Sequence, residues 1–173
     1  MIIKLFFILK ISFFYFLSIN FSLADLQKDI INKLNETQTL AFDFKQKIAD
    51  KEEMGNCFIK YPFLMKCNYK NLKEKTIISN GKTVAIIKKK YKKIYLYPLK
   101  STPLFLILGK EKIIDLIKKT DPSEINTNLV GFMFSDKKNN KVNILFDKNS
   151  LELKGWETKD AYSNKVIFEI NNL

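Results

Sequence analysis

The chain has 173 residues, of which 30 are Lys or Arg and 18 are Asp or Glu, so its formal net charge is +12. It contains two cysteines, five glycines and no histidine. The lack of histidine excludes Ser-His and Cys-His nucleophiles, two sulfurs do not complete a tetrahedral metal site, and the few glycines form no phosphate-binding loop. We therefore expect neither an enzyme nor a bound metal or other cofactor.

The first 24 residues have the layout of a secretory signal peptide. Lys4 and Lys10 accompany a long apolar run, and the small residues Ser22 and Ala24 precede a cleavage point before Asp25. A retained membrane anchor is the alternative, because the apolar run approaches the length of a spanning helix. We expect the cleaved, mature protein in a bacterial periplasm, with the outside of the cell as the other destination that such a segment allows.

The mature chain, residues 25–173, is long enough for one domain with a hydrophobic core. The signal peptide contains two lysines and no acidic residue, so its removal changes the formal net charge from +12 to +10. In an exported protein the counterpart of this charge is an anionic lipid surface or an acidic partner protein rather than nucleic acid.

One helix is predicted at the start of the mature chain, followed by many strands. Residues 25–36 place the apolar side chains Leu26, Ile30, Ile31 and Leu34 on one side of a helix. Residues 39–48 then alternate between apolar and polar side chains, with Gln46 as the exception on the apolar side, which indicates a strand with one wet face.

The two-residue period continues almost to the end of the chain. Cys57 and Ile59 share one face, as do Met65, Cys67 and Tyr69, with a turn at residues 61–63 between the two strands. Further strands are predicted at residues 75–79, 82–87, 93–97, 129–135, 141–146, 150–156 and 164–170. Turns are predicted at Asn80-Gly81, 137–140 and 147–150. About ten antiparallel strands with short turns form a large curled sheet, half or fully closed.

A lysine-rich stretch, Ile86 to Tyr97, lies within this pattern and has the sequence IIKKKYKKIYLY. Its apolar ends are typical of the two arms of a hairpin, and KKKYKK forms the tip. Hydrated lysines at a hairpin tip protect the edge of a sheet from aggregation. That interpretation is favoured, and contact with lipid headgroups or with a partner is the alternative.

Residues 101–122 interrupt the strand pattern. Thr102 is the predicted N-cap and Pro103 the first helical residue, and five apolar residues follow before Gly109. A second apolar stripe then continues to the end of the helix at Asp121 and Pro122. A helix that is apolar on all sides must be buried between other parts of the protein, or must pack over an apolar ligand. Two such helices on a curved sheet either fill an ordinary core or close a ligand cavity.

Several motifs together resemble the LolA family of periplasmic lipoprotein carriers. They are FDFKQK (42–47), GNCFIKYP (55–62), ISNGKT (78–83), YPLKSTPLFLIL (97–108) and GWETKDAYSNKVIFEI (155–170), in family order and spacing. The resemblance implies a mainly β protein, an incomplete antiparallel β-barrel with a helical lid, whose apolar cavity takes the acyl chains of lipoproteins. It also implies a monomer that receives cargo from an inner-membrane release complex and delivers it to an outer-membrane acceptor, without chemistry.

The predicted cavity and lid residues are all apolar. They are Phe42, Phe44, Met65, Leu104, Phe105, Leu106, Ile107 and Trp156. Each acyl methylene removed from water contributes about 0.8 kcal/mol, so about ten of them supply ~8 kcal/mol, which corresponds to micromolar binding. The alternative function is an envelope protein of the same fold that binds a partner protein or a membrane surface and carries no lipid.

This sequence departs from the family in three places. Where many members have an arginine that holds the lid shut, this chain has Tyr61, which donates only one hydrogen bond and carries no charge. The chain stops at Leu173, whereas many members continue into a further loop and strand. The third departure is a pair of cysteines. A three-residue turn centred on Pro62 places Cys57 opposite Cys67, within reach of a disulfide. A register slip of one residue leaves two buried thiols instead.

Overall fold

The computed structural model of the protein describes residues 23–70, 74–135, 141–160 and 162–173. Most of the predicted signal peptide and the predicted turn at 137–140 lie outside these ranges. Within them, no helix is both long enough and apolar enough to cross a bilayer.

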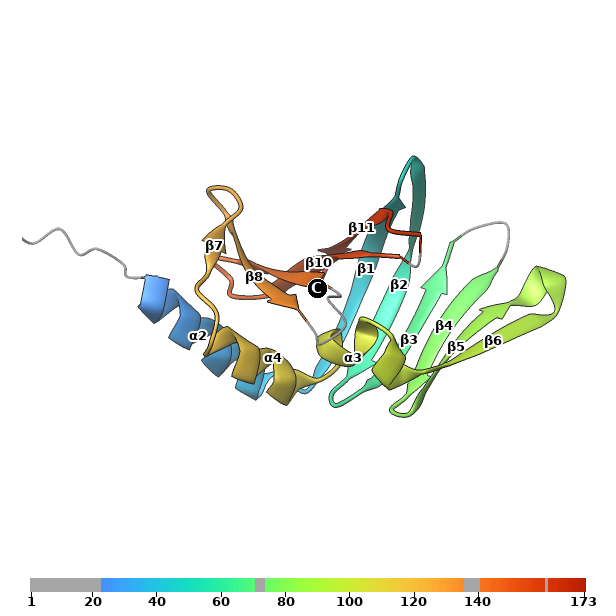
Figure 1. Ribbon diagram of the computed structural model, residues 1–173, viewed down its shortest axis with the longest axis horizontal. Helices are drawn as coiled ribbons and strands as arrows, with labels where there is room; N and C mark the ends of the chain where they lie inside the picture. The colour runs from blue at the N-terminus through green and yellow to red at the C-terminus, as the bar shows by residue number, and fades with distance from the viewer. Residues whose placement is uncertain (1–22, 71–73, 136–140, 161) are drawn as a thin grey trace, which may run out of the picture.

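The described residues form short helices and many strands (Figure 1). The helices are α2 (Leu23–Glu36), α3 (Leu104–Ile107) and α4 (Lys110–Ile117), with 3-10 turns η1 (Lys89–Tyr91) and η2 (Leu99–Ser101). The strands are β1 (Thr39–Ile48), β2 (Lys51–Lys60), β3 (Leu64–Tyr69), β4 (Lys75–Asn80), β5 (Thr83–Lys88), β6 (Lys93–Pro98), β7 (Ser123–Glu124), β8 (Leu129–Ser135), β9 (Lys141–Asp147), β10 (Leu153–Lys159) and β11 (Lys165–Asn171).

All of these strands belong to one antiparallel sheet with the order β6-β5-β4-β3-β2-β1-β11-β10-β9-β8-β7. Because β6 and β7 lie at opposite ends of this order, the sheet is not closed into a barrel. Figure 1 shows the β7–β10 half turned against the β1–β6 half, so that the sheet curls. The prediction of a mainly β protein with a curled, half-closed sheet is confirmed.

The helices lie on the inner, concave face of the sheet. In α2 the predicted stripe is present, with Ile30 and Leu34 buried and Leu26 and Ile31 packed against the core. Figure 1 shows α2 beside α4, and the Gln27 side-chain amide donates a hydrogen bond to the Ile117 carbonyl of α4. The apolar faces of both helices are therefore covered by the sheet and by each other.

Local turn chemistry sets the register of the β4–β5 hairpin. Gly81 has a φ of +90°, which favours glycine, and the Asn80 side-chain oxygen accepts hydrogen bonds from the backbone N–H groups of Lys82 and Thr83. The strong hairpin signal in the sequence is thus confirmed.

The start of α3 differs from the prediction. The Thr102 hydroxyl does not cap the helix; it donates to the Leu99 carbonyl at 2.9 Å, and α3 begins only at Leu104. The η2 turn places that carbonyl next to the hydroxyl, which explains the difference. Gly109 separates α3 from α4, as predicted.

Candidate functional site

A row of aromatic rings crosses the inner face of the sheet. Trp156 on β10 stacks on Phe168 on β11, with ring centroids 4.1 Å apart, and Phe168 stacks on Phe44 of β1 at 4.7 Å. Phe44 in turn meets the edge of Tyr69 on β3 at 4.8 Å. The four side chains are almost completely buried, so they form a rigid apolar floor across the sheet.

The row passes over β2 because that strand has a glycine at the crossing point. Gly55 pairs with Phe44 on one side and with Tyr69 on the other. A Cβ atom at position 55 would lie 2.6 Å from the Phe44 ring and 2.1 Å from the Asn68 carbonyl oxygen. The absence of a side chain on β2 therefore lets the Phe44 ring reach Tyr69.

The lid consists of η2, α3 and the start of α4, and it is attached to the corner between β2 and β3. The Phe63 N–H donates a hydrogen bond of 2.9 Å to the Leu108 carbonyl, which links the corner to the end of α3. The Phe63 ring also stacks on Phe105 at 5.4 Å, and the Lys112 ammonium lies 4.7 Å from the Phe105 ring centroid. Between described residues, one backbone hydrogen bond and an aromatic stack thus connect α3 to this corner.

Between α3 and the aromatic floor is a cavity of about 160 Å³. It is lined by Gln46, Met65, Cys67, Tyr69, Ile77, Pro103, Leu104, Ile107, Trp156, Thr158, Val166 and Phe168. None of these residues is charged, and most are apolar. A cavity of about 150 Å³ with apolar walls admits a molecule the size of benzene. The cavity can therefore take a short piece of hydrocarbon in this conformation.

The predicted cavity and lid residues occupy three kinds of position. Met65, Leu104, Ile107 and Trp156 line the cavity. Phe42 and Phe44 are buried on the inner face of β1 but lie outside the cavity wall. The other two belong to the lid: Phe105 stacks on the corner and Leu106 is half-buried against the core.

Seven other wall residues were not predicted, and they come from several strands and from the start of the lid: Gln46, Tyr69, Ile77, Pro103, Thr158, Val166 and Phe168. Ile77 and Val166 lie in strands that were predicted, on alternating apolar positions that are equally compatible with a packed core. Phe168 lies in the motif GWETKDAYSNKVIFEI, so its alternating position next to Val166 was a usable signal. Thr158 had no such signal, because a threonine near a strand end is common on a solvated face.

The polar groups in the wall satisfy each other. The Tyr69 hydroxyl donates to the Gln46 side-chain oxygen at 2.5 Å, which accounts for a glutamine on the apolar side of β1. Burial, and secondarily the Glu53 carboxylate, raises the pKa of Tyr69 above its usual value. Lys75 forms an ion pair with Glu53 and its ammonium lies 3.7 Å from the Tyr69 ring centroid. The charges therefore lie beside Tyr69, outside the cavity wall.

Tyr61, at the predicted latch position, is buried at the corner between β2 and β3. Its peptide bond to Pro62 is cis, and its backbone N–H donates to the Gln38 carbonyl at 2.9 Å. Within the described residues its hydroxyl has no hydrogen-bond partner, and burial raises its pKa. The polar contact between the corner and the lid comes from Phe63, two residues further along.

Cys57 and Cys67 lie directly opposite each other on β2 and β3 and form a disulfide. Their Cα atoms are 4.1 Å apart, and both side chains face the inner side of the sheet, where Cys67 contributes to the cavity wall. The disulfide therefore links the two strands that carry the lid corner.

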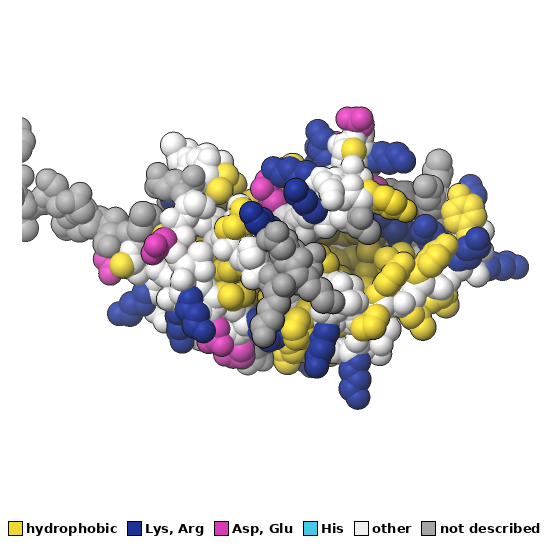
Figure 2. Space-filling view, viewed as in Figure 1, with side chains coloured by type: hydrophobic (Ala, Val, Ile, Leu, Met, Phe, Trp, Pro, Cys, Tyr) yellow, Lys and Arg dark blue, Asp and Glu magenta, His cyan; other side chains and the backbone are white. Residues whose placement is uncertain are grey.

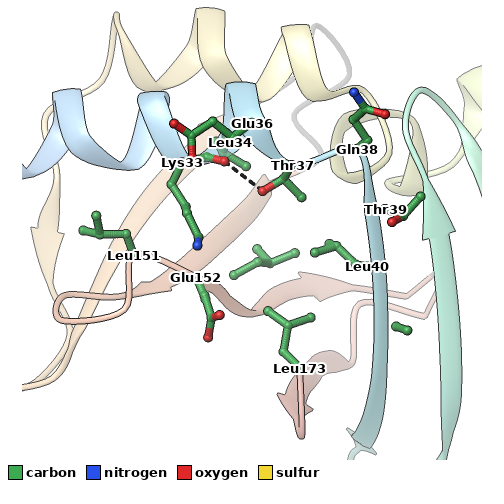
Figure 3. Close-up of a pocket in the computed structure, with 12 residues that line it drawn as sticks. Lys33, Leu34, Glu36, Thr37, Gln38, Thr39, Leu40, Leu151, Glu152 and Leu173 are labelled. Carbon is green, nitrogen blue, oxygen red and sulfur yellow. Dashed lines mark hydrogen bonds between the residues drawn. The ribbon is translucent and has the colours of Figure 1, made fainter.

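Two other hollows differ in character from the cavity. Figure 3 shows a groove of about 480 Å³ between the end of α2 and the start of β1, where Leu40 and Leu173 lie close to the charged side chains of Lys33 and Glu152. The second, of about 540 Å³, is a shallow groove at the corner end of β1–β4 that includes the exposed Phe58. Neither combines an uncharged wall with a helical cover, so the space under α3 is the best candidate for an apolar ligand.

Comparison with known proteins agrees with this fold. The family model described as "Outer membrane lipoprotein carrier protein LolA" matches residues 35–173. No curated protein matches the chain.

Similar solved structures include three bacterial proteins. A LolA superfamily protein from Nitrosomonas europaea has a TM-score of 0.42 and 8% identity, and the match covers 84% of this chain and 91% of that one. An uncharacterised conserved protein from Thermus thermophilus has a TM-score of 0.47 and 10% identity, and the match covers 87% of this chain and 88% of that one. A putative outer membrane lipoprotein-sorting protein domain from Vibrio parahaemolyticus has a TM-score of 0.41 and 10% identity, and the match covers 84% of this chain and 89% of that one. At these scores the likeness carries no argument about function.

Proposed function

Because this chain belongs to the LolA family of outer membrane lipoprotein carrier proteins, we propose that it is a periplasmic carrier that binds the acyl chains of lipoproteins under α3. It receives them at an inner-membrane release complex and delivers them to an outer-membrane acceptor, without catalysing a reaction. The observation that carries this proposal is the uncharged cavity of about 160 Å³ between α3 and the aromatic floor.

The cavity opens onto an apolar track along the inner face of the sheet. Cross-strand pairing places Cys67, Ile77, Ile86 and Tyr95 in one row from β3 to β6. Cys67 and Ile77 line the cavity, whereas Ile86 is half-buried and Tyr95 is exposed. Three strand spacings correspond to about 14 Å, so hydrocarbon can extend along this row beyond the cavity. Figure 2 shows a hollow with a hydrophobic floor beside these strands.

Binding of a whole acyl chain also requires movement of the lid. A benzene-sized space covers about six carbons, which supply ~5 kcal/mol at about 0.8 kcal/mol per methylene. The rest of the acyl chain needs more apolar surface than the cavity offers. Displacement of α3 gives access to that surface, which is the row formed by Ile77, Ile86 and Tyr95 on β4–β6.

Displacement of α3 breaks the contacts of Phe63 with Leu108 and Phe105, and it also uncovers Ile107, which is 1% exposed. Bound hydrocarbon therefore has to cover the surface that Ile107 loses, and closure of α3 over that surface favours release at the acceptor.

The proposal is tested by filling the cavity. Ile77 points into it from β4, and its neighbour Ile78 points to the outer face, so Ile77→Phe and Ile78→Phe form a matched pair. We expect Ile77→Phe to weaken binding of an apolar dye and its displacement by an acylated peptide about tenfold, since it removes space for about two methylenes. Ile78→Phe should bind like the native protein.

A second measurement identifies natural cargo. The protein is purified from the periplasm of its host, and bound lipid or lipoprotein is identified by mass spectrometry. A protein that is free of cargo and does not bind the dye would contradict the carrier function. It would favour the alternative, an envelope protein of the same fold that binds a partner or a membrane surface without lipid.

A further inference from the structure

The hairpin formed by β5, η1 and β6, residues Thr83–Pro98, extends to one end of the molecule, and we call it the wing (Figure 1). Its outer strand, β6, is the end of the sheet order, so one of its edges has no partner strand among the described residues. Every residue of β6 is exposed, although four of the six are Ile, Leu or Tyr. Exposed apolar surface of this kind marks a contact site.

Both faces of β6 are apolar. Cross-strand pairing places Tyr95 and Tyr97 on the inner face, opposite Ile86 and Val84 of β5. The alternate residues Ile94 and Leu96 point to the outer face, where their side chains are 63% and 66% exposed. A strand that only borders the internal cavity needs an apolar inner face, so the two outer residues require a separate explanation.

The outer face of the sheet continues this apolar surface. From β1 to β6 one cross-strand row consists of Ala41, Phe58, Lys66, Ile78, Ala85 and Leu96. Phe58 is 56% exposed, and Lys66 is the only charged member of the row. The next row ends in Ile87 and Ile94. Exposed apolar side chains also occur on β2 and β3, but five of the twelve large apolar residues that are exposed in the described chain lie in the wing, namely Tyr91, Ile94, Tyr95, Leu96 and Tyr97.

The charge of the wing has one sign. From Lys75 to Lys110 the sequence has nine lysines and no Asp or Glu. Five of these lysines, at positions 88, 89, 90, 92 and 93, form the tip, and none of the five has an ion pair with a described residue. Figure 2 shows lysines beside hydrophobic side chains at this end of the molecule. Tyr91, also at the tip, is half exposed.

We propose that the wing docks on an anionic membrane surface, with the tip lysines at the lipid phosphates and the side chains of β6 at the boundary between headgroups and acyl chains. Lysine clusters are attracted to anionic bilayers, and tyrosine favours this boundary because its ring is apolar and its hydroxyl is polar. The lysine stems extend along apolar surface while their ammonium groups stay in water.

The two-faced pattern of β6 favours a bilayer over a protein partner. A protein that pairs with a sheet covers one face or one edge, and it leaves the other apolar face of β6 in water. The lipid interface surrounds a hairpin on both faces, and its water and phosphates satisfy the free edge of the strand. Docking in this way places the inner row of Ile77, Ile86 and Tyr95 next to the membrane, but it does not depend on the carrier function.

The test uses the protein recovered from the soluble periplasmic fraction and sedimentation with vesicles. One set of vesicles contains phosphatidylcholine mixed with phosphatidylglycerol, and the other contains phosphatidylcholine alone. We expect the native protein to sediment with the anionic vesicles only, and to be released by added salt because the lysine contribution is screened. Absence of binding to anionic vesicles would overturn the proposal.

Three double variants locate the contact. Lys89→Glu with Lys90→Glu changes the tip, and Ile94→Ser with Leu96→Ser changes the outer face of β6. Lys118→Glu with Lys119→Glu, at exposed positions after α4, makes the same change in net charge as the tip variant. We expect the first two to weaken vesicle binding at least about tenfold and the third to bind like the native protein. Equal loss in the tip variant and the α4 variant would mean general charge attraction and would overturn the wing as the site.

Two further measurements separate the remaining outcomes. Circular dichroism and dye binding show that each variant is folded and has its cavity, so a failure of docking is distinguished from a failure of the carrier function. A photo-crosslinker at position 96 in living cells should label phospholipid. Labelling of a protein instead of phospholipid would overturn the proposal in favour of a protein partner.

Discussion

At the scale of single residues, the shape of the cavity floor depends on a position without a side chain. Gly55 lets the ring of Phe44 cross β2 and meet Tyr69, and Phe44 supports Phe168, which lines the cavity. The floor is therefore formed by large side chains from four strands, β10, β11, β1 and β3, and by the glycine on β2 that leaves room for them.

Substitution Gly55→Ala tests this arrangement. A Cβ at 2.1 Å from the Asn68 carbonyl oxygen and 2.6 Å from the Phe44 ring requires both to shift, which we expect to lower the free energy of unfolding by about 1–3 kcal/mol. Urea unfolding measures the loss. Lys60→Ala, at the exposed end of the same strand, should change stability little. A Gly55→Ala protein as stable as the native one would show that the sheet relaxes freely at this point.

At the scale of elements, the corner between β2 and β3 supports the lid. It carries the Phe63 contacts to the end of α3, and the disulfide between Cys57 and Cys67 lies in the same hairpin. The sequence predicted this hairpin from its alternation and its turn at Pro62, because both signals are local. The length of α3 was less predictable, because the Thr102 hydroxyl bonds to η2 instead of the helix.

The disulfide is the testable feature of this hairpin. Protein from an oxidising host should gain the mass of two hydrogens on reduction, and an unchanged mass would contradict the disulfide. Replacement of both Cys57 and Cys67 by Ala should lower the free energy of unfolding by about 3 kcal/mol through the lost loop constraint over 10 residues, and by a further amount because two buried sulfur atoms are removed. Urea unfolding of the oxidised protein and of the double variant measures this difference.

At the scale of the whole molecule, the buried phenols make stability depend on alkaline pH. Burial raises the pKa of Tyr61 and Tyr69 in the folded protein, whereas in the unfolded chain both ionise near pH 10. Above about pH 10 the unfolded state therefore binds fewer protons than the folded state. Because the folded state disfavours the ionised phenols, the free energy of unfolding is unaffected by them below that pH and falls as the pH rises from about 10 toward their folded pKa values.

We expect the free energy of unfolding to fall as the pH rises above about 10, and to fall less steeply in a Tyr61→Phe variant. The variant should also be more stable near neutral pH by about 1 kcal/mol, because it buries no unpaired hydroxyl. Tyr162→Phe is the control, since Tyr162 is 87% exposed. If the free energy of unfolding falls with pH equally steeply in all three proteins, the buried phenol of Tyr61 is not a cause of the pH dependence. If the lid of the Tyr61→Phe variant closes less tightly than that of the native protein, the hydroxyl has a latch role instead.

The amino-acid sequence by itself determined the strand pattern, the amphipathic α2 and the hairpin at Asn80-Gly81, whereas for Cys57 and Cys67 it left two registers open, between which the observed pairing of β2 with β3 decides. Each of the first three depends on side chains a few residues apart, whose period fixes which face they share. Only the tertiary structure decided that Met65, Leu104, Ile107 and Trp156 line a cavity while Phe42 and Phe44 lie outside its wall. A buried position has the same alternation in either case, and the distance between the packed elements decides whether space is left beside it.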